Sequence, residues 1–85
     1  MNTNQLKGIA SKFVFKSASV GATQQVHVAK PGAWDITLES TSSDGYTASV
    51  DINLPYWHDG YTGEKAAAEA ELMALTPPPD QIVVR

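Results

Sequence analysis

The chain of 85 residues contains no cysteine, and no stretch of it is both long and apolar. Without cysteine it can form neither a disulfide framework nor a thiolate metal site. No apolar run approaches the roughly 20 residues that a bilayer-spanning helix needs, and the N-terminal residues lack the apolar segment of a secretory signal. These absences predict a cytoplasmic protein with no membrane partner.

Basic residues are also scarce, and they are unevenly placed. Residues 1–30 contain four lysines and no acid, whereas residues 31–85 contain all nine acids against one lysine and one arginine, a local balance of −7. Binding to nucleic acid requires clustered Lys or Arg side chains that neutralise phosphates, so we expect no direct nucleic-acid contact. The asymmetry leaves two interpretations open: folding mixes the charges, or an acidic face attracts the basic surface of a larger protein.

The overall amino-acid composition is that of a globular protein. Hydrophobic residues make up 42% of the chain and charged residues 18%, which separates it from disordered proteins. A chain of this size buries about two-thirds of its unfolded surface, which is enough for one core. We therefore expect residues 1–85 to form a single domain, with residues 1–10 as a flexible polar arm.

Four segments alternate between apolar and polar residues, which is the period of a β-strand. They are residues 11–20, 24–30, 33–40 and 46–54. His27 lies on the polar face of the second segment. Pro31 and Gly32 favour a type II turn, so residues 24–40 are expected to form a hairpin. The apolar faces of the four segments predict the core: Phe13, Phe15, Val26, Val28, Trp34, Ile36, Leu38, Tyr46, Ala48, Val50, Ile52 and Leu54.

Residues 63–75 predict a helix, because they contain five alanines and no β-branched residue. Thr62 is expected to cap this helix, and Glu64 suits the positive end of the helix dipole. On a helical wheel the small side chains form one face, which we expect to pack on the sheet: Ala66, Ala67, Ala70, Met73 and Ala74. The remaining apolar residues fall elsewhere and are expected to reach a second contact: Ala68, Leu72 and Leu75.

Three prolines at residues 77–79 end the helix, and residues 81–84 predict a short final strand added to a sheet edge. The expected fold is therefore of the α+β class. It is an antiparallel β-meander of about four strands, with one helix packed on one face and a short C-terminal strand.

Candidates for catalysis and metal binding are few. The sequence contains no nucleophile elbow, phosphate-binding loop or zinc-protease motif. His58 beside Asp59 is the one candidate pair for a general base and its orienting partner, but adjacent residues do not reliably point together. His27, His58, Asp51 and Asp59 offer metal donors whose spacing matches no zinc or calcium template. We predict a protein that is not an enzyme and holds no metal or other cofactor.

The segment "LPYWHDGYTGEK", residues 54–65, joins the last strand of the predicted meander to the helix and is rich in aromatic residues. Tyr and Trp side chains are frequent in the centres of protein interfaces, because they bring large apolar area with little entropy to lose. The candidate partner-binding residues are Tyr56, Trp57, His58, Asp59 and Tyr61, supported by Asp51 and Glu64. An alternative stays open, in which one or two of the three rings fold back and cap the core.

The pattern "DGYTASVDINL…HDGYTGEKAAAEAELMAL", within residues 44–75, resembles the strand–strand–helix unit of small HicB-like antitoxin domains. It departs from them at Glu64-Lys65-Ala66, where their usual acidic-alanine pair is displaced. The meander with one helix is also similar to small phage and mobile-element proteins, including anti-CRISPR inhibitors. That resemblance implies a compact acidic protein that binds and blocks a partner in the cytoplasm of a bacterial host, and it assigns no residue roles.

The sequence therefore predicts a non-enzymatic protein-binding module, monomeric or homodimeric. It would act as a small phage or mobile-element inhibitor that blocks a basic or nucleic-acid-binding site on a larger protein. The alternatives are an antitoxin-like domain and a small structural or assembly protein. In the latter, the first strand and the terminal "QIVV" would pair with neighbouring chains.

Overall fold

The computed structural model describes all residues except 22, 31–33, 42–43 and 54–59, and of Val20, Gly60 and Tyr61 it describes only the backbone. The elements follow in the order α1 (Thr3–Ile9), β1 (Val14–Val20), β2 (Gln24–Lys30), β3 (Trp34–Ser40), β4 (Tyr46–Ile52), α2 (Gly60–Met73) and β5 (Gln81–Val84). This arrangement confirms the α+β class. None of the described helices is long and apolar enough to cross a membrane.

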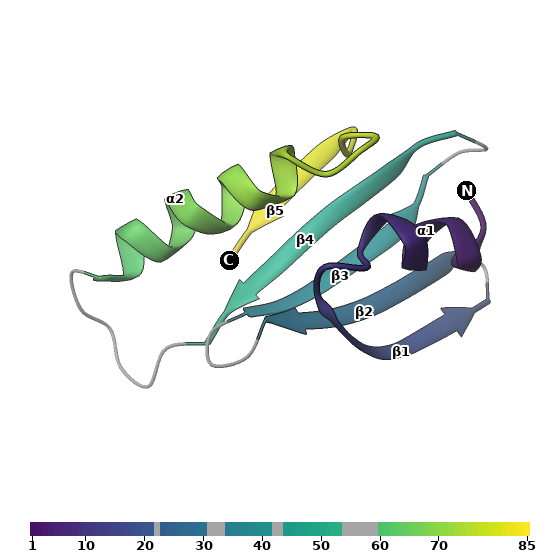
Figure 1. Ribbon diagram of the computed structural model, residues 1–85, viewed down its shortest axis with the longest axis horizontal. Coiled ribbons are helices and arrows are strands. Elements are labelled where there is room, and N and C mark those ends of the chain that lie inside the picture. The colour runs from purple at the N-terminus through teal and green to yellow at the C-terminus, as the bar shows by residue number, and fades with distance from the viewer. Residues whose placement is uncertain (22, 31–33, 42–43, 54–59) are drawn as a thin grey trace.

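The strands form one sheet in the order β1-β2-β3-β4-β5, which is also their order along the chain (Figure 1). The first four strands pair antiparallel, as the predicted meander requires. β5 lies parallel to β4, because the chain crosses back along α2 before the last strand begins. β1 and β5 are therefore the two edges, and β5 occupies the edge position predicted for it.

The cross-strand register places the predicted apolar residues of β2, β3 and β4 on one face. Val28 pairs with Ile36, and Ile36 pairs with Val50, and all three are buried. Both helices contribute to the same core cluster, Leu6 from α1 and Leu72 from α2, and burial of each such side chain stabilises the fold by about 1.5–3 kcal/mol. The other face of the sheet is open and mostly polar.

Residues 1–10 do not form the predicted flexible arm; most of them form α1. Asn2 and Gln5 make a capping box, in which the side chain of each accepts a hydrogen bond from the backbone N–H of the other, at 2.9 and 2.8 Å. Leu6 is fully buried under the sheet. Two helices, rather than the single predicted one, thus cover the sheet (Figure 1).

The buried face of α2 is the opposite of the predicted one. Ala68, Leu72 and the following Leu75 are buried, whereas the small-residue face is exposed, with Met73 at 61%. Two leucines remove more apolar area from water than a row of alanines, so they face the sheet. The predicted cap is also wrong, because α2 begins at Gly60 and Thr62 lies within its first turn.

β1 departs from the predicted pattern. The register shifts between Phe15 and Ser17, which leaves Lys16 without a partner across the pair and marks a β-bulge. Phe13 precedes the strand and packs against the core, but Phe15 is 48% exposed rather than buried. Side chains are exposed throughout residues 14–19, so β1 is an edge strand that buries neither of its faces. The predicted turn at residues 31–32 and the core position at residue 54 lie outside the described residues.

Candidate protein-binding surface

The structure describes only part of the predicted binding segment. Tyr56, Trp57, His58 and Asp59 lie outside the described residues, and Tyr61 is placed by its backbone alone, in the first turn of α2. Asp51 and Glu64 are described in full. The contacts of Asp51 and Glu64 show whether these two predicted site residues share one surface.

Asp51 lies near the end of β4, on the open face, directly across from Asp35 of β3. Two carboxylates in that position repel each other, and each has a cationic partner. Arg85 lies 3.6 Å from Asp51, and Lys16 lies 3.1 Å from Asp35. The hydrogen bond from Lys16 lowers the pKa of Asp35, and Asn53 donates a further bond to the same carboxylate. Asp51 thus belongs to a row of paired charges on the open face.

Glu64 is half-buried on α2 and accepts a hydrogen bond from the indole N–H of Trp34 at 2.7 Å. The ammonium of Lys30 lies over the ring of Trp34, 4.3 Å from its centre. The hydrogen bond between Trp34 and Glu64 holds α2 against the first residue of β3. Since α2 covers the core face and Asp51 lies on the open face, the structure does not bring Glu64 and Asp51 into one surface.

Folding neutralises much of the charge asymmetry of the sequence. Glu71 of α2 pairs with Lys30 at 2.8 Å and with Lys12 at 3.8 Å, and Lys16 pairs with Asp35. Three of the four lysines in residues 1–30 thus reach acids from later in the chain. The fourth, Lys7, lies over the ring of Phe15 at 4.6 Å. The first interpretation, that folding mixes the charges, is therefore confirmed for these lysines.

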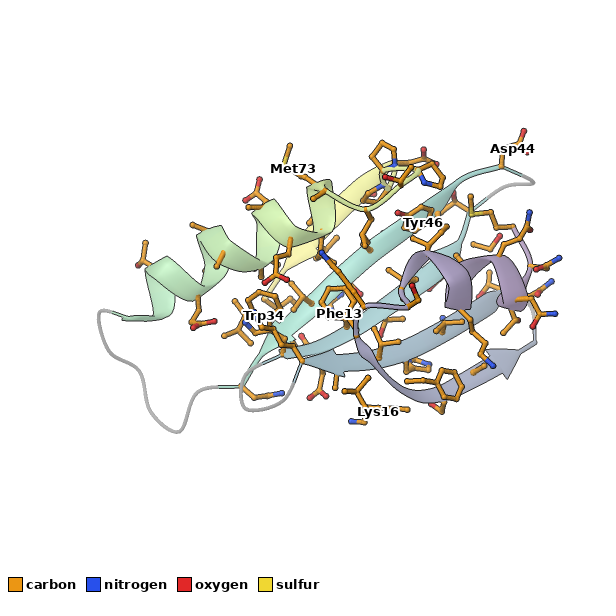
Figure 2. The ribbon with its side chains drawn as sticks, viewed as in Figure 1. Phe13, Lys16, Trp34, Asp44, Tyr46 and Met73 are labelled. Atoms are coloured by element: carbon orange, nitrogen blue, oxygen red, sulfur yellow. The ribbon has the colours of Figure 1, made fainter. Side chains whose placement is uncertain are left out.

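Two other acids lie where β4 and β5 begin, Asp44 in the β3–β4 connection and Asp80 directly before β5. Glu69 of α2 lines a groove together with Asp80. We call these three acids, Asp44, Glu69 and Asp80, the acidic end. Asp80 is anchored there by its N–H, which donates to the carbonyl of Tyr46 at 2.8 Å, and by the hydroxyl of Thr41, which donates to its carboxylate at 3.2 Å. Asp44 lies in the neighbouring β3–β4 connection (Figure 2). The N-terminal ammonium lies nearby and donates to the hydroxyl of Ser40 at 2.9 Å.

Tyr46 positions the proline segment that leads into β5. Its side chain is 1% exposed, and its hydroxyl donates to the backbone carbonyl of Pro77, which follows a cis peptide bond. Burial raises the pKa of Tyr46 to about 12, and the charge of Asp80 adds to the effect. The hydroxyl therefore stays a hydrogen-bond donor at neutral pH, and the segment stays fixed against β4.

An open groove lies beside this segment, between the C-terminal half of α2 and β5. Its volume is about 340 Å³. It is lined by Glu69, Met73, Pro78, Pro79, Asp80, Gln81 and Ile82. Met73 projects from α2 away from the sheet (Figure 2), so its side chain forms an exposed apolar wall. The groove combines apolar side chains with two carboxylates of the acidic end, and no local sequence pattern predicts it.

The open face carries a second hollow, of about 280 Å³, around His27. His27 is half-buried on the polar face of β2, as predicted, and its Nδ1 lies 3.2 Å from the hydroxyl of Thr37. The nearby carboxylate of Asp35 is bonded to Lys16 and Asn53, and the described partner of His27 is the Thr37 hydroxyl rather than the orienting carboxylate that a general base uses. Among the described residues, no three His, Asp or Glu side chains are placed to hold a metal ion.

Comparison with known proteins gives no family model that matches the chain, no curated protein similar to it and no solved structure that matches it. The resemblance to HicB-like antitoxin domains and to anti-CRISPR inhibitors stays a prediction. Among the described residues, the groove between α2 and β5 combines exposed apolar side chains with carboxylates.

Proposed function

We propose that the protein is a non-enzymatic binding module that covers a basic site on a larger protein. The observation that supports this is the groove beside β5, where Met73 and Ile82 form apolar walls and Glu69 and Asp80 add carboxylates. Apolar contact contributes affinity, and charge complementarity selects the partner and speeds its approach. A surface that combines the two is suited to a protein segment rich in Lys or Arg.

A basic site that binds nucleic acid is the most concrete target. Such sites expose clustered Lys and Arg side chains that neutralise phosphates, and an acidic protein surface can occupy the same side chains. The module would then act as a blocking inhibitor of the kind found in phages and mobile elements. It would lower the affinity of its target for nucleic acid without touching nucleic acid itself.

The aromatic segment adds a second predicted contact. Tyr56, Trp57, His58, Asp59 and Tyr61 keep the binding role that the sequence predicts for them. α2 begins at Gly60 and ends at Met73, beside the groove, so about 20 Å of helix separates its first residue from the acidic end. An interface that used both would run along the whole length of α2.

Crosslinked affinity capture from the source cells tests the proposal. The acidic-end variant combines Asp44→Asn, Glu69→Gln and Asp80→Asn. The matched control, Asp35→Asn with Glu39→Gln, neutralises carboxylates on the open face instead. We expect wild type and control to retain a protein with a basic surface and to inhibit its nucleic-acid binding, and the acidic-end variant to lose both.

Retention of every captured protein by the folded acidic-end variant would contradict the proposal. A second pair of variants, Trp57→Ala and Tyr61→Ala, tests the aromatic segment in the same assay. If both fold and keep every partner, the aromatic segment is not part of the interface, and the acidic end must account for binding alone.

A second candidate function is assembly through sheet edges. The observation that favours it is β1, a seven-residue edge strand with Val14 at 53% and Phe15 at 48% exposure. Such an edge can pair with another chain. Sedimentation at rising concentration separates the two functions, because assembly through β1 makes the mass grow with concentration and a Phe15→Lys variant should remain monomeric. A monodisperse monomer at all concentrations argues against assembly.

A further inference from the structure

We propose that the groove between α2 and β5 is a docking site for an extended basic segment of the partner. The segment pairs with the outer edge of β5 and places an Arg or Lys side chain in the groove. This inference rests on the proposed function and specifies how the acidic end would recognise its partner. It is built from three features: the edge of β5, the chemistry of the groove and the rigidity of its walls.

The first feature is the outer edge of β5, which is the last strand of the sheet. Both backbone groups of Arg85, directly after the strand, bond to β4: its N–H donates to the carbonyl of Val50, and its carbonyl accepts from the N–H of Ile52. Backbone groups of successive strand residues point to alternate sides, so those of Ile82 and Val84 point away from β4. An edge of this kind accepts an added strand through main-chain hydrogen bonds.

The second feature is the match between the groove and a long basic side chain. Arg and Lys carry an aliphatic stem and a charged head, and the stem packs on apolar surface while the head stays near water or a counter-charge. Met73 and Pro79 offer such a surface, and Glu69 and Asp80 offer the counter-charges. The volume, about 340 Å³, is at the lower end of the range for small-molecule pockets, roughly 300–1,000 Å³, and suits one or two side chains.

The third feature is that the groove walls are already held in place. The hydroxyl of Tyr46 holds the carbonyl of Pro77, and Thr41 holds the carboxylate of Asp80. On the other wall, Glu71 ties α2 to Lys30 and Lys12. A preformed site loses less conformational entropy on binding, which matters for a contact with few side chains.

Charge also distinguishes the two edges of the sheet. β1 contains no acidic residue and its Lys16 already pairs with Asp35, so this strand offers a basic segment no counter-charge of its own. β5 begins directly after Asp80 and faces Glu69 across the groove. A basic segment is therefore directed to β5, although β1 is the longer edge strand.

The experiment titrates the full chain with a capped heptapeptide in which valine and arginine alternate, and follows backbone amide shifts by NMR. We expect shift changes concentrated at residues 69–73 and 80–84. A peptide with citrulline in place of arginine has the same shape without the charge and should bind at least tenfold more weakly. Glu69→Gln should weaken binding by about two- to fivefold at low salt, as expected for a partly exposed ion pair, and Asp35→Asn, on the open face of β3, should leave it unchanged.

A second peptide tests strand addition itself. Methyl groups on alternate backbone nitrogens remove the donors that would face β5 and keep the side chains, so this peptide should lose binding. Equal binding of the methylated and unmethylated peptides would overturn the inference, and so would shift changes concentrated at β1 or on the open face. If the peptide does not bind in the groove while the acidic-end variant still loses its captured protein, the docking inference is wrong and the proposed function is supported. If that variant keeps every captured protein, the proposed function falls whatever the peptide does.

Discussion

The hydroxyl of Tyr46 donates a hydrogen bond to the carbonyl of Pro77, which lies 31 residues later in the chain. This bond joins the first residue of β4 to the segment between α2 and β5. Tyr46→Phe removes the donor and leaves a carbonyl without its partner, so we expect the free energy of unfolding to fall by about 0.5–1.5 kcal/mol. Urea denaturation measures the change. A variant as stable as wild type would show that this bond contributes nothing to the position of the proline segment.

Alkaline pH tests the same residue independently. Burial raises the pKa of Tyr46 to about 12, above the value of about 10 in an unfolded chain. A raised pKa means that the Tyr46 hydroxyl holds its proton more tightly in the folded state than in the unfolded state. The free energy by which this difference stabilises the folded state is fully present below pH 10 and is lost between pH 10 and 12. The full effect is on the order of 2 kcal/mol. In unfolding experiments at each pH, wild type should lose stability more steeply than Tyr46→Phe across this range, and parallel curves would contradict the assignment.

Glu71 is expected to be the most stabilising acid of α2. It pairs with both Lys12 and Lys30, which bring the N-terminal part of the chain to the helix. Exposed ion pairs contribute up to about 1 kcal/mol each, so Glu71→Gln should lower the free energy of unfolding by about 0.5–1.5 kcal/mol at low salt. The loss should shrink as salt screens the charges. Glu69→Gln, on the exposed side of the same helix, is the matched control and should change stability by less than about 0.5 kcal/mol.

Strand periodicity predicts most of the sheet. The alternation in residues 24–30, 33–40 and 46–54 places β2, β3 and β4 within two residues of their observed ends, because one face of each strand is buried and the other is open. The burial of side chains on β1 is harder to predict from the sequence. A bulge after Phe15 shifts the register of the strand, and the side chains of residues 14–19 are exposed on both faces, so its alternation does not report burial.

The helices and the site depend on contacts that local patterns do not contain. α1 spans seven residues, which is too short to show a clear period, although Asn2 and Gln5 have the spacing of a capping box. The partners of Glu64 and Asp51, Trp34 and Arg85, come from distant parts of the sequence. The groove requires α2 and β5 to lie side by side, and the pairing of β5 with β4 brings β5 to that position.

The orientation of α2 can be tested directly with two neighbouring residues. Leu72 is fully buried, and the adjacent Met73 is 61% exposed. Leu72→Ala should lower the free energy of unfolding by about 2–5 kcal/mol, because it leaves a cavity in the core. Met73→Ala should change it by no more than about 0.5 kcal/mol. Equal losses in thermal or urea unfolding would mean that the helix is rotated from the position described, and a larger loss at Met73 would restore the face that the helical wheel predicted.

The role of α1 can be tested at Leu6, its one fully buried side chain. A flexible arm predicts that substitutions in residues 1–10 leave stability unchanged. The helix predicts that Leu6→Ala lowers the free energy of unfolding by about 2–5 kcal/mol, because a leucine side chain leaves the core beneath the sheet. Asn4→Ala, at an exposed position of the same helix, is the control and should have little effect. If Leu6→Ala unfolds at the same urea concentration as Asn4→Ala, α1 contributes nothing to the core, and the arm is the better description of these residues.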